Sequence, residues 1–232
     1  MTLSETTSAA ILLLLSGNEA LWEIISISFS VSLRAILYVT PFALILAYIF
    51  SYFRIPGKRV LLSIFNTMLA IPAVVIGLTL YILFSRSGPM GDWRLLFTQD
   101  AMIIGQMIMA FPIILVMAHS AIQASDRRLW ETAITLGASP IRAMATLFYE
   151  VRFGLLAAIV AGFGRIIAEV GCSMMVGGNI LHVTRNIPTA IALETSKGEF
   201  AQGIALGIVL LILALTLNLG LGFFQGRGEL RS

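Results

Sequence analysis

The sequence is poor in charged residues, cysteine and histidine. Of its 232 residues 12% are charged, one is cysteine and two are histidine, whereas 58% are hydrophobic and the mean hydropathy is +0.95. A soluble domain of this length needs more polar surface to cover its core, so the composition excludes that class and indicates a polytopic membrane protein. The lone Cys172 excludes an intrachain disulfide, and we expect it to be a small apolar packing residue.

Catalytic motifs are also missing. The sequence has no Gly-x-x-x-x-Gly-Lys-Ser/Thr loop and no His-Glu-x-x-His pattern, so we predict no nucleotide hydrolysis, no catalytic residues, no metal and no cofactor. Gly171-Cys172-Ser173 has the outline of a nucleophile motif, which makes an intramembrane protease a rival hypothesis. Its base would be His119, at the end of a different span, or His182, outside the spans, and no second glycine follows Ser173. We therefore reject it.

Five apolar segments are long enough to cross a bilayer, because each supplies about 20 mostly apolar residues at 1.5 Å per residue. They are residues 24–53, 60–84, 101–121, 153–178 and 203–224. The expected fold class is therefore all-α transmembrane. Residues 24–224 form its one domain, preceded by an arm or interfacial helix over 1–23, without a cleavable signal peptide, and followed by a tail over 225–232.

Three of these spans contain a proline near their middle, namely Pro41, Pro72 and Pro112. Proline removes a backbone donor and kinks a helix. Two interpretations stay open: these are ordinary membrane-helix prolines, or they bend the helices around a central passage.

The basic residues of the loops predict the orientation. One side holds Arg54, Lys58, Arg59, Arg127, Arg128, Arg142, Arg152, Arg227 and Arg231, and the other holds Arg86, Arg94, Arg185 and Lys197. Because lysine and arginine concentrate in cytoplasmic loops, we expect the amino terminus outside and the carboxyl terminus in the cytoplasm. This placement also explains the net charge of +3 and the pI of 9.4 without nucleic acid as a partner.

The loop over residues 122–152 contains the longest charged stretch of the chain. We expect Asp126 to be the N-cap of a helix that runs through Leu136, with Gly137 in the left-handed conformation that ends it. Ser139-Pro140 has the pattern of a second helix start, with serine as N-cap and proline at the first position. The sequence thus predicts two short helices that meet at an elbow.

The first of these helices is amphipathic. Its apolar positions Leu129, Ala133 and Leu136 share one face, whereas its polar positions lie elsewhere, namely Arg128, Glu131 and Thr135. On physical grounds alone, such a helix either lies flat on the membrane surface or projects from it to bind another protein.

Glu131-Thr132-Ala133 followed by Gly137 resembles the EAA loop of permease subunits in bacterial ABC importers, with Thr132 where the family has its first alanine. The resemblance implies that this loop is a cytoplasmic coupling helix, which fits into a groove on a separate ABC ATPase. The ATPase-coupling residues would be Arg128, Glu131, Thr132, Ala133, Leu136, Gly137, Ala138 and Ser139.

Residues 162–180, with the sequence GFGRIIAEVGCSMMVGGNI, resemble the fourth core helix of molybdate and tungstate permeases. The continuation over 189–200 is more similar to the tungstate branch, and the resemblance covers about residues 24–224. It implies the five-span core of a type I ABC importer permease in the bacterial inner membrane. It also implies a second copy of the chain, an extracytoplasmic substrate-binding protein and an oxyanion cargo, with tungstate favoured over molybdate or another oxyanion.

Arg165 and Glu169 stand four residues apart inside an apolar span. Each costs about 2.5–3.5 kcal/mol to insert and avoids lipid. They either pair on one helix face, with Arg34 joining them, or attract the divalent oxyanion. Met174 and Met175 fill packing gaps or form a hydrophobic gate. These five residues are the predicted translocation pathway or gate.

A self-standing channel or secondary transporter is the remaining rival. Many secondary transporters have two inverted halves. Five unequal spans with one large loop do not fit that pattern, so we favour an importer driven by a separate ATPase.

Overall fold

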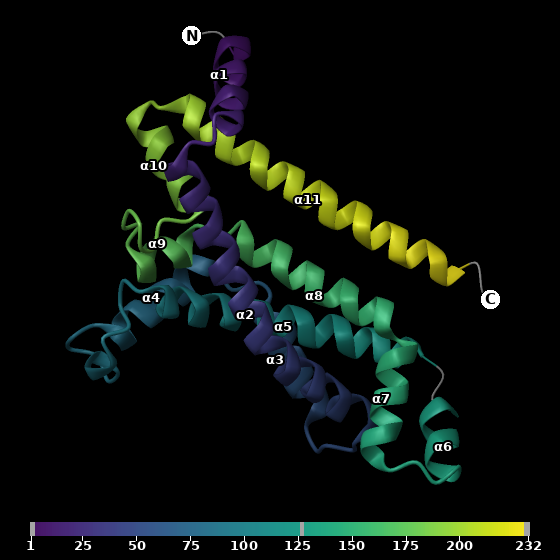
Figure 1. The fold of residues 1–232 in the computed structure, drawn as a ribbon. Coiled ribbons are helices and arrows are strands. Elements are labelled where there is room, and N and C mark those ends of the chain that lie inside the picture. The colour runs from purple at the N-terminus through teal and green to yellow at the C-terminus, as the bar shows by residue number, and fades with distance from the viewer. Residues whose placement is uncertain (1–2, 126–127, 230–232) are drawn as a thin grey trace.

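The computed structural model describes residues 3–125 and 128–229, including their side chains except those of residues 3–6, 129 and 221–229. Within these ranges the chain is all helical. Its elements are α1 (Leu3–Leu15), α2 (Glu19–Tyr52), α3 (Lys58–Met68), α4 (Ala73–Phe84), the 3₁₀ turn η1 (Gly91–Trp93), α5 (Gln99–Ala124), α6 (Arg128–Thr135), α7 (Pro140–Glu150), α8 (Arg152–Ile167), α9 (Gly171–Gly177), α10 (Ile187–Lys197) and α11 (Phe200–Glu229). Figure 1 shows α6 and α7 at one end of an elongated molecule and α1 and α10 at the other.

The core lies where α2, α5 and α8 pack together. Its centre is apolar, and Ala35, Ile114 and Ile166 are fully buried there. Small residues allow the close packing, because a Cβ at Gly162 would lie 2.9 Å from Cγ1 of Ile114, and one at Gly154 would lie 2.6 Å from Cβ of Ala121. In a membrane the hydrophobic effect does not drive helices together, because the lipid tails are as apolar as the side chains. Helices associate there through close van der Waals packing, which small residues allow.

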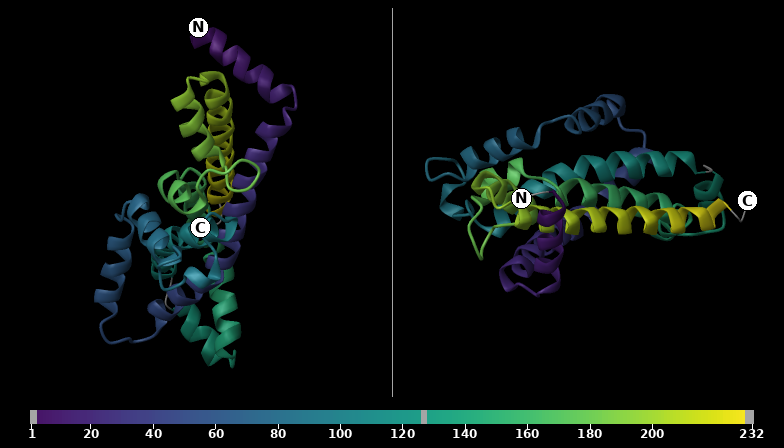
Figure 2. Two further views of the ribbon diagram at one scale, coloured as in Figure 1. Left: turned by 90° about the vertical axis from the view of Figure 1, so that its left-hand side faces the viewer. Right: turned by 90° about the horizontal axis from the view of Figure 1, so that it is seen from above.

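Among the residues that the structure describes, three helices are long and apolar enough to cross a membrane: α2, α5 and, over residues 200–220, α11. Two bent pairs, α3 with α4 (97°) and α7 with α8 (74°), would raise the number of spans to five. In Figure 2, α3 and α4 lie along one edge of the bundle of α5, α8 and α11, where both contact α5. The exact set of five spans stays a prediction.

Two predicted segments are not continuous helices. Residues 60–84 divide into α3 and α4, with Pro72 at the N-cap of α4, because proline lacks a donor and disfavours helix in the residue before it. The interpretation of 153–178 as one helix is wrong, since α8 ends at Ile167 and α9 starts at Gly171. By contrast, α2 and α5 continue through Pro41 and Pro112.

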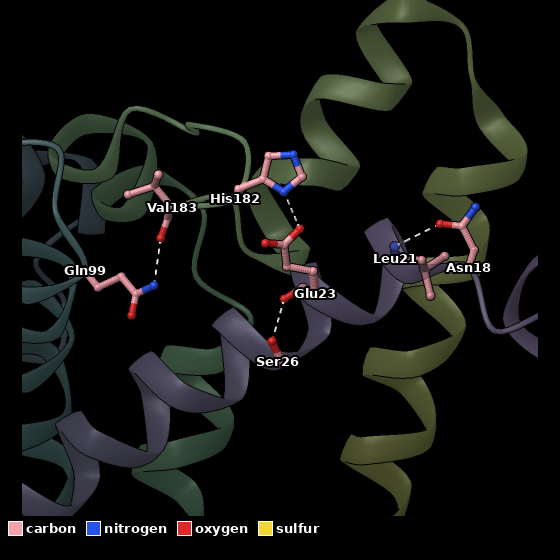
Figure 3. A network of polar contacts seen from close by, with 7 residues as sticks. All are labelled: Asn18, Leu21, Glu23, Ser26, Gln99, His182 and Val183. Atoms are coloured by element: carbon pink, nitrogen blue, oxygen red, sulfur yellow. Dashed lines mark hydrogen bonds and ion pairs between the residues drawn. The ribbon is translucent and has the colours of Figure 1, made fainter.

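The helices of the first and last predicted spans, α2 and α11, are longer than those spans. The helix α2 begins at Glu19 and has 34 residues, or about 51 Å, against about 30 Å of hydrocarbon. Its N-cap is Asn18, whose Oδ1 accepts the N–H of Leu21 at 3.2 Å (Figure 3). The arm over 1–23 contains α1, whose Ala10 belongs to the same apolar cluster as Leu206 of α11.

The contact between α4 and α9 has no room for a larger side chain. A Cβ at Gly77 would lie 2.8 Å from the Cα of Cys172, which is backbone and cannot move aside. We expect Gly77→Val to destabilise the protein by about 1–3 kcal/mol, because overpacking forces the two helices apart. This lowers the thermal unfolding midpoint in detergent by about 2–12 °C. The control Gly207→Val adds its side chain where, apart from its chain neighbours and the nearby backbone of its own helix, no atom of the described residues lies within 4 Å of the new Cβ. An equal shift in both variants would contradict the prediction.

Candidate functional site

The elbow between α6 and α7 has the predicted backbone. Gly137 has φ +84°, the left-handed conformation that favours glycine, and Ser139 is the N-cap of α7, with Pro140 at its first position. The Ser139 hydroxyl accepts the N–H of Arg142 at 3.5 Å. The local predictions for Gly137 and Ser139 are therefore confirmed.

The first helix of the segment is shorter than predicted. It ends at Thr135, one residue before Leu136. The predicted N-cap Asp126 lies outside the described residues, as does the side chain of Leu129. Of the predicted coupling residues, six are exposed and two are half-buried; the exposed ones are Arg128, Glu131, Thr132, Leu136, Gly137 and Ser139, and the half-buried ones are Ala133 and Ala138.

The tip of the segment presents apolar side chains away from the bundle. Leu136 is 83% exposed and Ile141 75%. Large apolar side chains that cluster in the open, among polar ones such as Glu131, are typical of protein contact sites. The geometry of this segment is thus suited to bind another protein.

The opposite side of the segment is fixed to α2 by aromatic rings, which we call the aromatic joint: Tyr48, Tyr52, Trp130 and Phe148. The ring centroid of Trp130 lies 5.5 Å from that of Tyr48 and 5.1 Å from that of Tyr52. Phe148 of α7 lies 6.1 Å from Tyr48 in an edge-to-face arrangement. The sequence did not predict this joint; the spacing of Tyr48 and Tyr52, four apart on one helix face, is its one local signal.

A second rigid connection joins α7 to α8. The chain bends by 74° at Val151, and the guanidinium of Arg152 lies 4.3 Å from the ring centre of Tyr149 and 4.6 Å from that of Phe153. Arg152 Nη1 also donates to the Tyr149 carbonyl at 2.6 Å. These cation–π and hydrogen-bond contacts hold the bend, so α8 follows α7 directly.

Of the two alternatives for Arg165 and Glu169, the ion pair is wrong. The structure describes both side chains, and no ion pair joins them; Arg165 is exposed, whereas Glu169 is 3% exposed. The helix stops at Ile167, so the two residues do not share a helix face. Instead, the Glu169 carboxylate accepts the N–H groups of Cys172 and Ser173 at 2.6 and 3.1 Å and the Ser173 hydroxyl at 3.3 Å.

Arg34 does not join Arg165 and Glu169 either. Its Nη2 donates to Gln99 Oε1 at 2.5 Å and to the Ser30 hydroxyl at 3.0 Å. Gln99 Nε2 in turn donates to the Val183 carbonyl at 2.8 Å (Figure 3). Arg34 therefore connects α2 to the first residue of α5 and to the loop between α9 and α10.

The same loop has a further connection to α2. In Figure 3 the ring of His182 points at the carboxylate of Glu23, with Nδ1 2.5 Å from Oε2. Thr184 donates its hydroxyl to the Gly177 carbonyl at 2.5 Å, which holds the loop against the end of α9. The short helix α10 follows the loop, with Asn186 as its N-cap.

The two methionines differ in their surroundings. Met174 is 39% exposed on α9, whereas Met175 is half-buried beside Gly77, where an added Cβ would lie 3.0 Å from the Cβ of Met175. The structure thus brings Glu169, Met174 and Met175 together at α9, with Arg165 at the end of the preceding helix.

The fold and the site define an all-helical membrane protein with an exposed two-helix segment that is suited to bind another protein. Residues 39–227 match the family described as binding-protein-dependent transport system inner membrane component, and the chain belongs to this family. The family is not catalytic, and its ATPase is a separate subunit.

Individual relatives agree with this assignment. The chain is 44% identical, over 72% of its length and 70% of the relative's, to the tungstate uptake system permease protein TupB of Campylobacter jejuni. It is 34% identical to TupB of Peptoclostridium acidaminophilum, over 93% and 95% of the two chains. It also has the fold of a solved structure of the MetNI methionine ABC transporter, with a TM-score of 0.64 and 19% identity over 89% of this chain and 93% of that one.

We expect Trp130→Ala to release the two-helix segment α6–α7 from α2. The change removes two ring contacts worth about 0.5–1.5 kcal/mol each, which corresponds to about 5- to 150-fold more local opening. Trypsin should therefore cut faster at Arg142 in the purified protein. Trp93→Ala, at a 65% exposed tryptophan in η1, is the control. Unchanged cutting at Arg142 in Trp130→Ala would show that the aromatic joint does not hold the segment.

Proposed function

We propose that this chain is the membrane subunit of an ATP-driven oxyanion importer with tungstate as its cargo. The observation that carries the proposal is the two-helix segment α6–α7, which we call the coupling segment. Its apolar tip at Leu136 and Ile141 is exposed, while its other side is fixed to α2 by the aromatic joint. The similarity to the tungstate permeases supports the choice of cargo. Molybdate or another oxyanion is the competing cargo.

The ATPase subunit binds the elbow between α6 and α7. Leu136 and Ile141 supply apolar contacts, and Glu131 and Thr132 lie exposed beside them for polar ones. The remaining coupling residues shape the elbow: Arg128, Ala133, Gly137, Ala138 and Ser139. When the two ATPase subunits close on ATP, they move the elbow. The aromatic joint transmits this movement to α2, and the bend at Val151 transmits it to α8.

The coupling segment faces the cytoplasm, and the amino terminus lies outside. Along α2, Arg34 precedes Tyr52 at the helix end by about 27 Å, close to the thickness of the hydrocarbon layer. This spacing supports a position of Arg34 near one membrane surface and of the basic turn with Arg54 and Lys58 near the other. The substrate-binding protein then docks at the end of the molecule that holds α10 and the loop 178–186.

Two copies of the chain enclose one pathway. The exposed side chains at the α8–α9 break, Arg165, Val170 and Met174, face the second copy across it. Arg165 offers its charge to a passing anion, while the charge of Glu169 is held by hydrogen bonds. Met174 contributes to an apolar constriction that opens and closes.

The apolar tip provides the test of coupling. Leu136→Asp places a charge where the ATPase must exclude water, which costs at least about 3 kcal/mol and lowers ATP-dependent uptake of tungstate about 100-fold or more. The measurement is uptake by proteoliposomes that contain the permease, its ATPase and the binding protein. Leu136→Met keeps the contact apolar and retains uptake.

Uptake without any ATPase subunit would instead favour a secondary transporter. Calorimetry of the binding protein with tungstate, molybdate and sulfate shows which of these oxyanions is the cargo.

Arg165 provides the test of the pathway. Because Arg165 has no ion-pair partner in Glu169, its loss does not strand a buried charge. We expect Arg165→Gln to assemble with the ATPase in normal yield and to transport oxyanion about tenfold more slowly, since one favourable charge contact is missing. Arg165→Lys should restore most of the rate. Failed assembly of Arg165→Gln would indicate a structural role.

A further inference from the structure

We propose that Glu169 is the positioning residue that fastens the gate helix α9 to α8, so that α9 follows the movement of the coupling segment. The inference rests on the proposed function, because it takes α9 as the moving part of an ATP-coupled pathway. It assigns to Glu169 neither cargo binding nor an ion pair, but a mechanical connection across a broken helix.

The first step is the geometry of the break. Residues 168–170 separate the two helices, and the first N–H groups of α9 have no helical partner. The N-cap Val170 offers no side-chain acceptor, so the carboxylate of Glu169 takes that place. One oxygen accepts the N–H of Cys172 at 2.6 Å, and the other accepts the N–H and hydroxyl of Ser173 at 3.1 and 3.3 Å.

The second step is the other side of the break. The carbonyl of Ile166, in the last turn of α8, accepts the N–H of Glu169 at 3.3 Å and the side-chain amide of Gln106 at 3.3 Å. Glu169 is thus bonded by its backbone to α8 and by its side chain to α9. Since both Glu169 and Gln106 are at least 97% buried, water does not compete for these bonds.

The third step is that α9 is a small rigid body. A Cβ at Gly171 would lie 2.4 Å from Cγ2 of Val74, and one at Gly105 would lie 2.5 Å from Sγ of Cys172, so α9 contacts α4 and α5 without spare space. At its far end the carbonyl of Val176 accepts the N–H of Phe97 at 2.8 Å. A helix this tightly packed moves as a unit, together with the exposed Met174 that it carries.

The fourth step connects these parts. The bend at Val151 passes movement of α7 to α8, a helix of 16 residues. At the carboxyl-terminal end of α8 the chain leaves the helix, and a flexible joint there would lose the movement. The carboxylate of Glu169 makes the break between α8 and α9 rigid, so that a displacement of the coupling segment also moves α9 and its Met174.

The single cysteine of the chain permits a direct test. Cys172→Ala removes the only thiol and leaves the backbone N–H that bonds Glu169. In this background Met174→Cys reports the position of α9 through its rate of reaction with a charged maleimide. In the complex with the ATPase we expect this rate to change about tenfold between the nucleotide-free state and the state with a non-hydrolysable ATP analogue.

Glu169→Ala should reduce that change to less than about twofold, because loss of hydrogen bonds to a buried charged group uncouples the two helices. Glu169→Gln keeps one acceptor oxygen and should give an intermediate response even if the alanine variant assembles poorly. The matched control is Glu194→Ala, which removes a carboxylate that is also buried (5% exposed) but pairs with Lys197 inside α10. It should keep the full response.

The outcomes separate this inference from the function. The parent is the variant with Cys172→Ala and Met174→Cys, and its response is the change in maleimide rate between the two nucleotide states. If the parent binds the ATPase and responds, and adding Glu169→Ala or Glu169→Gln leaves the response unchanged, Glu169 does not connect α8 to α9. If the parent binds the ATPase but Met174→Cys never responds, α9 does not move, and the inference fails while the coupling function stands. If the parent does not bind the ATPase at all, the proposed function itself fails.

Discussion

The hydrogen bonds of Glu169 make the break between α8 and α9 possible. Within a bilayer there is no water to satisfy the backbone groups that an interrupted helix leaves free. At this break the carboxylate accepts the N–H groups of Cys172 and Ser173, and Gln106 donates to the freed carbonyl of Ile166. Because its charge is satisfied locally, Glu169 needs no arginine, and Arg165 stays exposed.

The rest of the molecule consists of stiff helices that meet at a few defined joints. The aromatic joint fixes α6 and α7 to α2, and the cation–π contacts of Arg152 fix the bend into α8. At the other end, Arg34 and Gln99 connect α2, α5 and the loop that follows α9. A displacement of α6 and α7 would therefore move α2 through the aromatic joint and α8 through the bend at Val151.

The predictions of local conformation were correct where the conformation depends on a residue's own neighbours in sequence. Gly137 and Ser139 adopt the predicted conformations because a helix end and a helix start are set by the residues of one turn. The pairing of Arg165 with Glu169 was wrong because it assumed that the helix continues. The position of Trp130 against Tyr48 and Tyr52 could not be predicted, since it joins segments about 80 residues apart.

The sequence by itself determined the class of the protein, its apolar segments and the elbow of its coupling loop, because composition, hydrophobic length and capping are local properties. Only the tertiary structure decided where the helices break and which partners the buried polar groups take. A charge inside a bundle bonds to whatever group the packing brings within about 3 Å. That group is a backbone N–H for Glu169 and a side-chain amide for Arg34, and no local pattern distinguishes these from an ion pair.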